Sequence, residues 1–223
     1  MSLKLTTADV AAITRSIAPD RLSTYAAPAG STDPLYPLSL YSWNVKISGA
    51  FLVPLQIFEV VMRNAIAEGL ENKYGARWPW DRGFEWSLPA PARGYNPRQE
   101  LQYVKGKVSR LPTSKAIPEF TLAFWSHLLT SRHDTRIWDH HLLTVFPHLP
   151  SGISVSDGRK KIHDDMEVLR KFRNRIAHHE PILKAPLSAH LNVIRELVSF
   201  RCPSTTSWLD QIETVSATLG QRP

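Results

Sequence analysis

The chain has 223 residues, of which 43% are hydrophobic and 21% charged. This is the balance of an ordinary globular protein that is long enough to bury a core. The formal net charge of +7 is compatible with nucleic acid or another anionic partner, and the single cysteine, Cys202, excludes a disulfide framework and a cysteine-based zinc site within one chain.

The chain shows no targeting or membrane segment in its sequence pattern. Met1 is not followed by the apolar core of a signal peptide, and no uninterrupted apolar run reaches the roughly 18 residues of a membrane span. The longest candidate, residues 47–66, is interrupted by Ser48, Gln56, Glu59, Arg63 and Asn64. One cysteine also fits a reducing compartment, so we expect a cytoplasmic protein without a membrane partner.

Hydrophobic residues recur at helical spacing through most of the chain, and no segment shows strand alternation. The first core helix is predicted over about 38–74, where Pro54 is expected to remove one hydrogen bond and kink it. Residues 27–37 and the aromatic, proline-rich residues 75–96 are predicted as connections. Further helices are predicted at 7–17 (capped by Thr7), 97–110 (capped by Asn96), 118–129, 134–145, 157–179 (capped by Ser156 or Asp157), 188–202 and 206–219. The pattern predicts an all-α fold.

The predicted helix over 157–179 carries a charge on its apolar face. On an ideal helix Arg173 falls within the stripe formed by Ile162, Met166, Leu169 and Ile176. Such a charge must be paired or reach water. The structural interpretation is an ion pair with a carboxylate on a neighbouring helix, for which Glu59 is a candidate, and position alone favours it. The functional alternative is an arginine placed to bind phosphate.

Two polar residues of this helix share another face. Asn174 and His178 are four residues apart, whereas Arg173 and His178 are separated by ~140° around the axis. Spacing alone therefore does not bring Arg173 and His178 together, and a second copy of the chain is one way to complete a site. His178 and His179 lie at the carboxyl end, where the helix dipole favours the protonated form; the alternative role for either is to cap the last carbonyls.

These residues belong to a longer recognisable block. The run from Arg173 to Ile182, RNRIAHHEPI, resembles the carboxyl-terminal signature of Abi-like proteins of the HEPN superfamily, and its first six residues fit the R-N-x-x-x-H motif. Earlier segments are similar to the other blocks of that family: Tyr41-x-Trp43-Asn44, Ser48-Gly49-Ala50-Phe51, Glu59-x-x-x-Arg63-Asn64-Ala65-Ile66, Tyr74-Gly75-x-x-Trp78, Phe120–Trp125, Trp138 and Phe146-Pro147. One departure is Ala123, where the family more often has glycine. The resemblance covers roughly residues 35–185.

The resemblance implies a helical bundle that commonly dimerises through its motif helices, and a metal-independent endoribonuclease. In that chemistry the RNA 2′-hydroxyl attacks the adjacent phosphorus and leaves a 2′,3′-cyclic phosphate. The resemblance implies that His178 is the general acid or base, with His179 as the second choice. It implies that Arg173 stabilises the charge on the phosphate. It also implies that Asn174 orients His178 or binds a phosphate oxygen. Accessory residues are Arg175, Glu59, Arg63 and Asn64, the last three also explained by a structural salt bridge and hydrogen bonds.

The expected organisation is an N-terminal extension (1–34), an Abi-like helical domain (35–203) and a C-terminal helix (204–223) packed on it. The expected partners are RNA, a second copy of the chain, and an antitoxin or regulatory RNA in phage defence or toxin function. A weak basic RNA-binding side comprises Lys105, Lys107, Arg110 and Lys115. No metal or cofactor is expected, because His140-His141 and His163-Asp164-Asp165 lack a familiar metal spacing.

Two alternatives to the nuclease remain open. One is a non-catalytic RNA-binding protein that uses the same cleft. Base stacking on Trp78, Trp80 or Trp86 fits either RNA hypothesis, although core or loop packing explains these residues more simply. The other alternative is a protein-interaction module, in which Arg173 and His178 only hold a dimer together.

Overall fold

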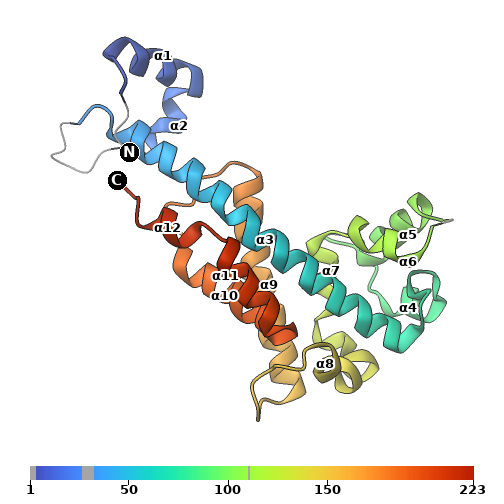
Figure 1. Ribbon diagram of the computed structural model, residues 1–223. Coiled ribbons are helices and arrows are strands. Elements are labelled where there is room, and N and C mark those ends of the chain that lie inside the picture. The colour runs from blue at the N-terminus through green and yellow to red at the C-terminus, as the bar shows by residue number, and fades with distance from the viewer. Residues whose placement is uncertain (1–3, 27–32, 110) are drawn as a thin grey trace.

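The structure is a computed structural model that describes residues 4–26, 33–109 and 111–223, and within these ranges it contains helices and no strand (Figure 1). The all-α prediction is confirmed. The α-helices are α1 (Thr7–Ile17), α2 (Pro19–Ser23), α3 (Tyr36–Tyr74), α4 (Arg82–Ser87), α5 (Pro97–Lys107), α6 (Thr113–Ala116), α7 (Leu122–Leu128), α8 (Asp139–Val145), α9 (Val155–Ala177), α10 (Leu187–Arg201), α11 (Pro203–Ile212) and α12 (Val215–Leu219). Short 3₁₀ turns lie at η1 (Trp78–Trp80), η2 (Ile117–Glu119) and η3 (Ser131–His133), and a π-helical turn at η4 (Asp134–Trp138).

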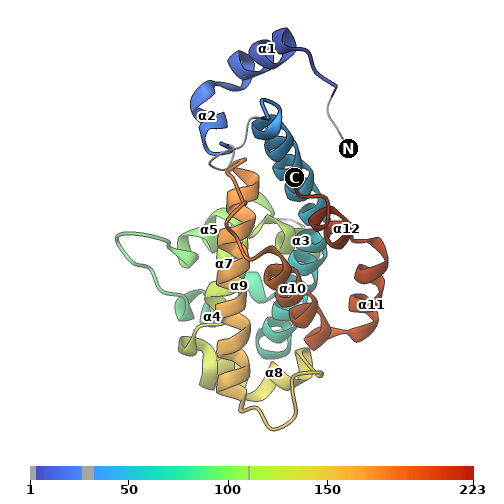
Figure 2. The same ribbon diagram turned by 90° about the vertical axis from the view of Figure 1, so that its left-hand side faces the viewer.

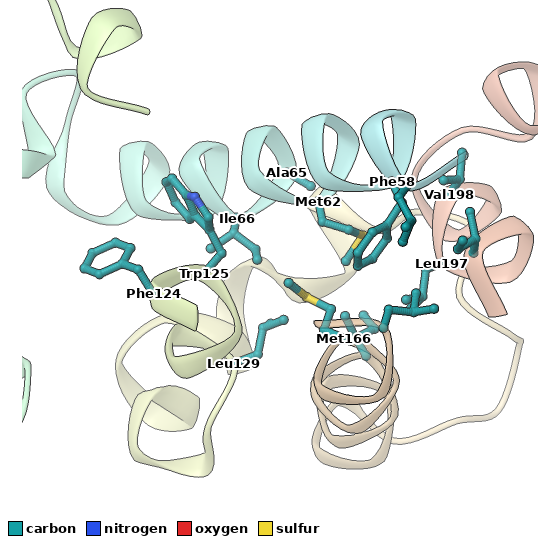
Figure 3. Packing of buried hydrophobic residues seen from close by; sticks show 14 of the residues in the cluster. Phe58, Met62, Ala65, Ile66, Phe124, Trp125, Leu129, Met166, Leu197 and Val198 are labelled. Carbon is teal, nitrogen blue, oxygen red and sulfur yellow. The ribbon is translucent and has the colours of Figure 1, made fainter. Parts of the chain in front are cut away.

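Helix α3 is the central helix of the fold, and several other helices pack along it (Figures 1 and 2). Its 39 residues correspond to ~58 Å of helix, and it continues through the buried Pro54 as one element. Helices α7, α8, α10 and α12 contact it directly, and α9 packs against α7, α8 and α10. Figure 3 shows Phe58, Met62 and Ile66 of α3 in one apolar core with Trp125 of α7, Met166 of α9 and Leu197 of α10, where Trp125 lies beside Ile66.

The starts of α1 and α9 differ from the prediction because a side-chain cap selects the first residue of each helix. Thr6, not Thr7, caps α1, since its hydroxyl accepts from the Asp9 amide and Asp9 accepts from the Thr6 amide. Ser154, not Ser156 or Asp157, caps α9 by accepting from the Asp157 amide. Helix α9 therefore begins two residues earlier than predicted. It also ends two residues earlier, so His178 and His179 lie just beyond it.

Other segments are more finely divided than predicted. Residues 75–96 contain η1 and α4, and the helix expected from Pro118 begins instead at Leu122, because Thr121 caps α7. Residues 134–145 form a π-helical turn followed by α8. The single helix expected over 206–219 is two helices, since Glu213 leaves the helical conformation and its carboxylate accepts from the Ser216 amide at the start of α12.

Helix α3 also has the composition of a membrane span. Among the described residues it is the one helix with an 18-residue window that is long and apolar enough, with a mean hydropathy of 1.6. One third of that window (33%) is buried inside the protein, and core helices of soluble proteins pass the same test. The expectations that the chain has no membrane partner and is cytoplasmic stay predictions.

Candidate functional site

The motif occupies the last turn of α9 and the residues that follow it. Arg173 lies on the side of α9 that faces α3, and its Nε donates to Glu59 Oε1 over 3.0 Å. The predicted structural partner of Arg173 is thereby confirmed. The Arg173 side chain remains 44% exposed, so water screens the pair and its contribution to folding is small. The pair fixes the direction of the guanidinium group and leaves part of it accessible.

A pocket of about 200 Å³ surrounds the Arg173 side chain. Glu59 and Arg63 of α3 form one wall, and the other consists of Pro118, Phe120, Thr121, Leu122 and Trp125. The Nε of Arg63 is buried and has no hydrogen-bond partner among the described residues. Two arginines and one carboxylate therefore share this pocket, which gives it a net positive charge that suits an anionic group. Asn64, the remaining accessory candidate on α3, is exposed and does not line the pocket.

Asn174 and His178 lie on a different side of α9. Asn174 is half-buried and its backbone carbonyl accepts from the His178 amide over 2.9 Å, whereas the His178 side chain is exposed. Within the described ranges the His178 ring has no hydrogen-bond partner and lines none of the pockets around the motif. A single chain thus holds Arg173 in a pocket and leaves His178 outside it, as the helical spacing indicated.

The turn after α9 is a Schellman motif. The His179 amide donates to the Ile176 carbonyl over 3.0 Å, and the Glu180 amide to the Arg175 carbonyl over 2.8 Å. His179 therefore has a φ of +56°, a conformation that usually favours glycine. This geometry ends the helix before His178, so neither histidine extends it.

Two arginine side chains, one from α9 itself and one from α2, hold this turn. Arg175 donates through Nη2 to the Pro181 carbonyl over 2.6 Å, and its Nη1 lies 3.6 Å from Glu180 Oε2. Arg21 of α2 donates to the His179 carbonyl. Arg175, predicted as an accessory site residue, and the His179 backbone therefore help to shape the loop.

Sequence reasoning missed two residues that position the motif. Asn44 is buried on α3, and its Oδ1 accepts from the Ile182 amide over 2.9 Å; a polar residue on the apolar face of α3 was the available signal. Arg21 had no such signal, because its contact with His179 spans 158 residues. Both residues tie the segment after α9 to the N-terminal half of the fold.

An apolar groove of about 450 Å³ lies beside the motif, between the first half of α3 and the end of α9. Val45 and Leu52 of α3, which are 53% and 56% exposed, form its rim. Ala177 and His179 line the opposite side. The groove therefore combines exposed apolar side chains with the last residues of the motif.

The predicted basic side is largely neutralised by carboxylates. Lys105 Nζ lies 2.6 Å from Glu85 Oε2, and Lys107 pairs with Glu119. Lys115 is exposed, and Arg110 lies outside the described residues. This leaves less free positive charge on α5 than the sequence indicated.

The tryptophans proposed for base stacking differ in their accessibility. Trp78 is fully buried in an aromatic cluster with Phe84 and Trp125, so it is a core residue. Arg77 covers Trp80 at 4.7 Å, and Arg98 covers Trp86 at 5.0 Å. Trp86 nevertheless remains 66% exposed and is the tryptophan that stays open to stacking.

The histidine clusters do not form a metal site within the described part of the chain, where no three His, Cys, Asp or Glu side chains are placed to hold an ion. The rings of His140 and His141 are 6.2 Å apart, and His163 Nδ1 lies 3.0 Å from Asp164 Oδ1.

Comparisons of the chain with models of protein families, with curated proteins and with solved structures give no match.

Proposed function

We propose that the chain is an endoribonuclease that cleaves RNA at the motif by attack of the 2′-hydroxyl. One His178 takes the proton of the 2′-hydroxyl, and O2′ forms a bond to the adjacent phosphorus. The bond from phosphorus to O5′ breaks, and a second imidazole protonates that leaving oxygen. The products are a 2′,3′-cyclic phosphate and a free 5′-hydroxyl. Arg173 stabilises the negative charge that develops on the phosphate oxygens.

The observation that carries this proposal is the accessible guanidinium of Arg173, held by Glu59 in a pocket that also contains Arg63. Arginine's planar group suits a phosphodiester, and the motif supplies an exposed imidazole one turn later. The formal net charge of +7 favours association with a polyanion. By the resemblance noted above, the biological setting would be phage defence or a toxin restrained by an antitoxin or a regulatory RNA.

We further propose that two copies complete the site. In one chain His178 lies outside the Arg173 pocket, so a second chain would have to bring its own histidine to it. The apolar groove beside the motif supports this pairing, because Val45 and Leu52 are unusually exposed for apolar residues at the edge of a core helix. Leu52→Asp is expected to lower both the dimer fraction in light scattering and the cleavage rate.

The test is incubation of the purified protein with end-labelled cellular RNA in excess EDTA. Arg173→Ala and His178→Ala are run beside it, with Lys171→Ala and His140→Ala as matched controls at exposed positions. Fragments ending in cyclic phosphate from the parent and the controls, and none from the two motif variants, would establish metal-independent cleavage by the motif. Equal fragments from all five proteins would rule the motif out as their source.

The second candidate function is RNA binding without cleavage. It is favoured by the separation of His178 from the Arg173 pocket, which leaves a single chain without an imidazole beside that pocket. RNA retention by every variant without turnover would support it. A pure interaction module instead predicts that Arg173→Ala lowers the dimer fraction, and an unchanged mass would eliminate that role.

A further inference from the structure

A second pocket lies between α7, α9 and the loop before α5. Its volume is about 400 Å³, within the range of small-ligand sites. Ala123 forms part of its wall, in the first turn of α7. Six polar side chains line the remainder: Tyr95, Ser126, His127, His163, Glu167 and Arg170.

The charges inside this pocket cancel. Arg170 donates to Glu167 through Nε over 2.9 Å and through Nη2 over 2.7 Å, and the Ser126 hydroxyl donates to the same carboxylate. The hydrogen bond from Arg170 lowers the pKa of Glu167, so this side chain is an anion at neutral pH. Arg170 Nη1 keeps a free donor within the described part of the fold. A phosphate would meet a carboxylate here as well as an arginine, so the pocket does not favour anions.

Two of the three ring side chains that line the pocket, Tyr95 and His127, are neutral at neutral pH. Burial lowers the pKa of His127, and the nearby His163 and Arg132 lower it further. A neutral imidazole offers one donor and one acceptor. Burial, followed by the contact with Glu100, raises the pKa of Tyr95. The rings of Tyr95 and His127 are 5.8 Å apart at 67°. These two rings contact each other edge to face, so a flat, uncharged heterocycle would pack on the partly exposed Tyr95 ring and pair with the donors and acceptors around it.

The pocket is aligned with the motif along α9. His163, Glu167, Arg170 and Asn174 are spaced by four, three and four residues, and His178 follows four residues later. On an ideal helix these residues lie within ~80° of one another, along ~22 Å of axis. Glu100 also accepts from the Tyr95 hydroxyl and from the Thr121 amide over 2.8 and 2.7 Å. This network connects the second pocket to the Arg173 pocket, which Thr121 lines.

We propose that this pocket binds a nucleobase of the RNA strand whose phosphate lies at the motif, and that it determines base preference. The inference rests on the proposed function for the identity of the strand. A strand following the polar face of α9 away from Asn174 would pass the pocket. Hydrogen bonds to His127, His163 and Arg170 Nη1 would then select the base that matches their donors and acceptors.

The test measures binding of non-cleavable oligonucleotides by fluorescence anisotropy at one salt concentration. Four 2′-O-methyl homopolymers, one for each base, are compared with an abasic chain of equal length. The proteins are the parent, Ala123→Phe to fill the pocket, His127→Phe to remove its donor and acceptor while keeping a ring, and Val168→Phe as an exposed control on α9. Circular dichroism checks that each variant is folded.

The parent and the Val168→Phe protein are expected to bind one base more tightly than the others and the abasic chain, by between about fivefold and about 100-fold. Ala123→Phe and His127→Phe should bind all five chains alike. The proposal would be overturned if the parent bound all four homopolymers with equal affinity, or if both pocket variants kept the parent's base preference. Cleavage of unmodified RNA is measured separately. Cleavage without base preference would support the nuclease proposal and contradict the base-binding role of this pocket. Base-selective binding without cleavage would support the base-binding role and contradict the nuclease proposal.

Discussion

Arg173 of α9 and Glu59 of α3 join the motif to the core helix across 114 residues of sequence, with Nε 3.0 Å from Oε1. Because the arginine side chain is 44% exposed, the pair adds only ~0–1 kcal/mol to the free energy of unfolding. Its larger effects are to orient the guanidinium group and to cancel its charge. An RNA phosphate that binds there must compete with the Glu59 carboxylate.

Glu59→Gln separates these two effects, since glutamine keeps an oxygen that accepts from Arg173 but carries no charge. We expect the Glu59→Gln protein to bind RNA more tightly than the parent at low salt. The slope of log association constant against log salt concentration should become more negative by ~0.7. Glu71→Gln, an exposed position near the end of α3, is the control for the change in net charge. Equal effects from both substitutions would show that Arg173 does not contact the phosphate chain.

Arg159 holds the π-helical turn against α9. Its Nε and Nη2 donate to the two carboxylate oxygens of Asp134 over 2.8 and 3.0 Å, and Nη1 donates to the Leu129 carbonyl over 3.1 Å. Arg159 is 6% exposed. Arg159→Ala is expected to lower the free energy of unfolding by about 3 kcal/mol, because Asp134 loses its partner in a largely buried setting. Urea denaturation measures this loss.

Lys160→Ala is the matched control for Arg159→Ala. Lys160 is the next residue, and it pairs with Asp164 on the exposed face of the same helix, with a side chain that is 66% exposed. Its removal is expected to change the free energy of unfolding by less than about 0.5 kcal/mol. Similar losses for both substitutions would contradict the buried role of Arg159.

His133 predicts a dependence of stability on pH. It is fully buried, and neither ring nitrogen has a hydrogen-bond partner among the described residues. Burial, with His127, Arg132 and Arg136 nearby, lowers its pKa from 6.5 to about 4. The unfolded chain therefore binds the proton first as pH falls, and stability present above pH 6.5 is lost towards pH 4, by up to about 3 kcal/mol.

The measurement is urea denaturation of the parent and of His133→Leu at several values between pH 7 and pH 5. We expect a smaller loss of stability per pH unit in the variant, whatever its absolute stability at pH 7. The half-buried His127 and the buried His190, whose pKa values are also lowered by burial, leave part of the slope in both proteins. His140→Leu, at an exposed position, should keep the parent's slope. Identical slopes in the parent and His133→Leu would contradict the lowered pKa.

Helical periodicity was enough to predict the fold class and to place Arg173 on the apolar face of its helix, where it needs a partner. Glu59 was only a candidate for that partner, and the structure shows the pair. The helix starts were misplaced for a local reason. Thr6 and Thr7, or Ser154 and Ser156, are equally able to cap, and only the aspartate three residues later distinguishes them. Asp9 and Asp157 are therefore the residues that mark these two helix starts in the sequence.

The two pockets beside α7 could not be predicted in this way. The contact between Ser126 and Glu167 spans 41 residues, and the one between Glu100 and Thr121 spans 21. Neither follows from periodicity, because each depends on how two helices meet. The end of α9 was missed for a different reason. The residue in the left-handed conformation is His179, where a glycine would have marked the end of the helix.

This conformation of His179 gives a test of which histidine would carry the proposed cleavage. His179→Gly is expected to leave the protein as stable as the parent or up to about 1 kcal/mol more stable, because glycine adopts a φ of +56° without steric cost. His179→Val should be destabilised by about 1–2 kcal/mol. If His179 serves only the turn, His179→Gly keeps the cleavage rate, whereas His178→Gly lowers it by about 100-fold or more. Cleavage lost in His179→Gly and kept in His178→Gly would make His179 the motif histidine, since the glycine variant leaves the turn intact.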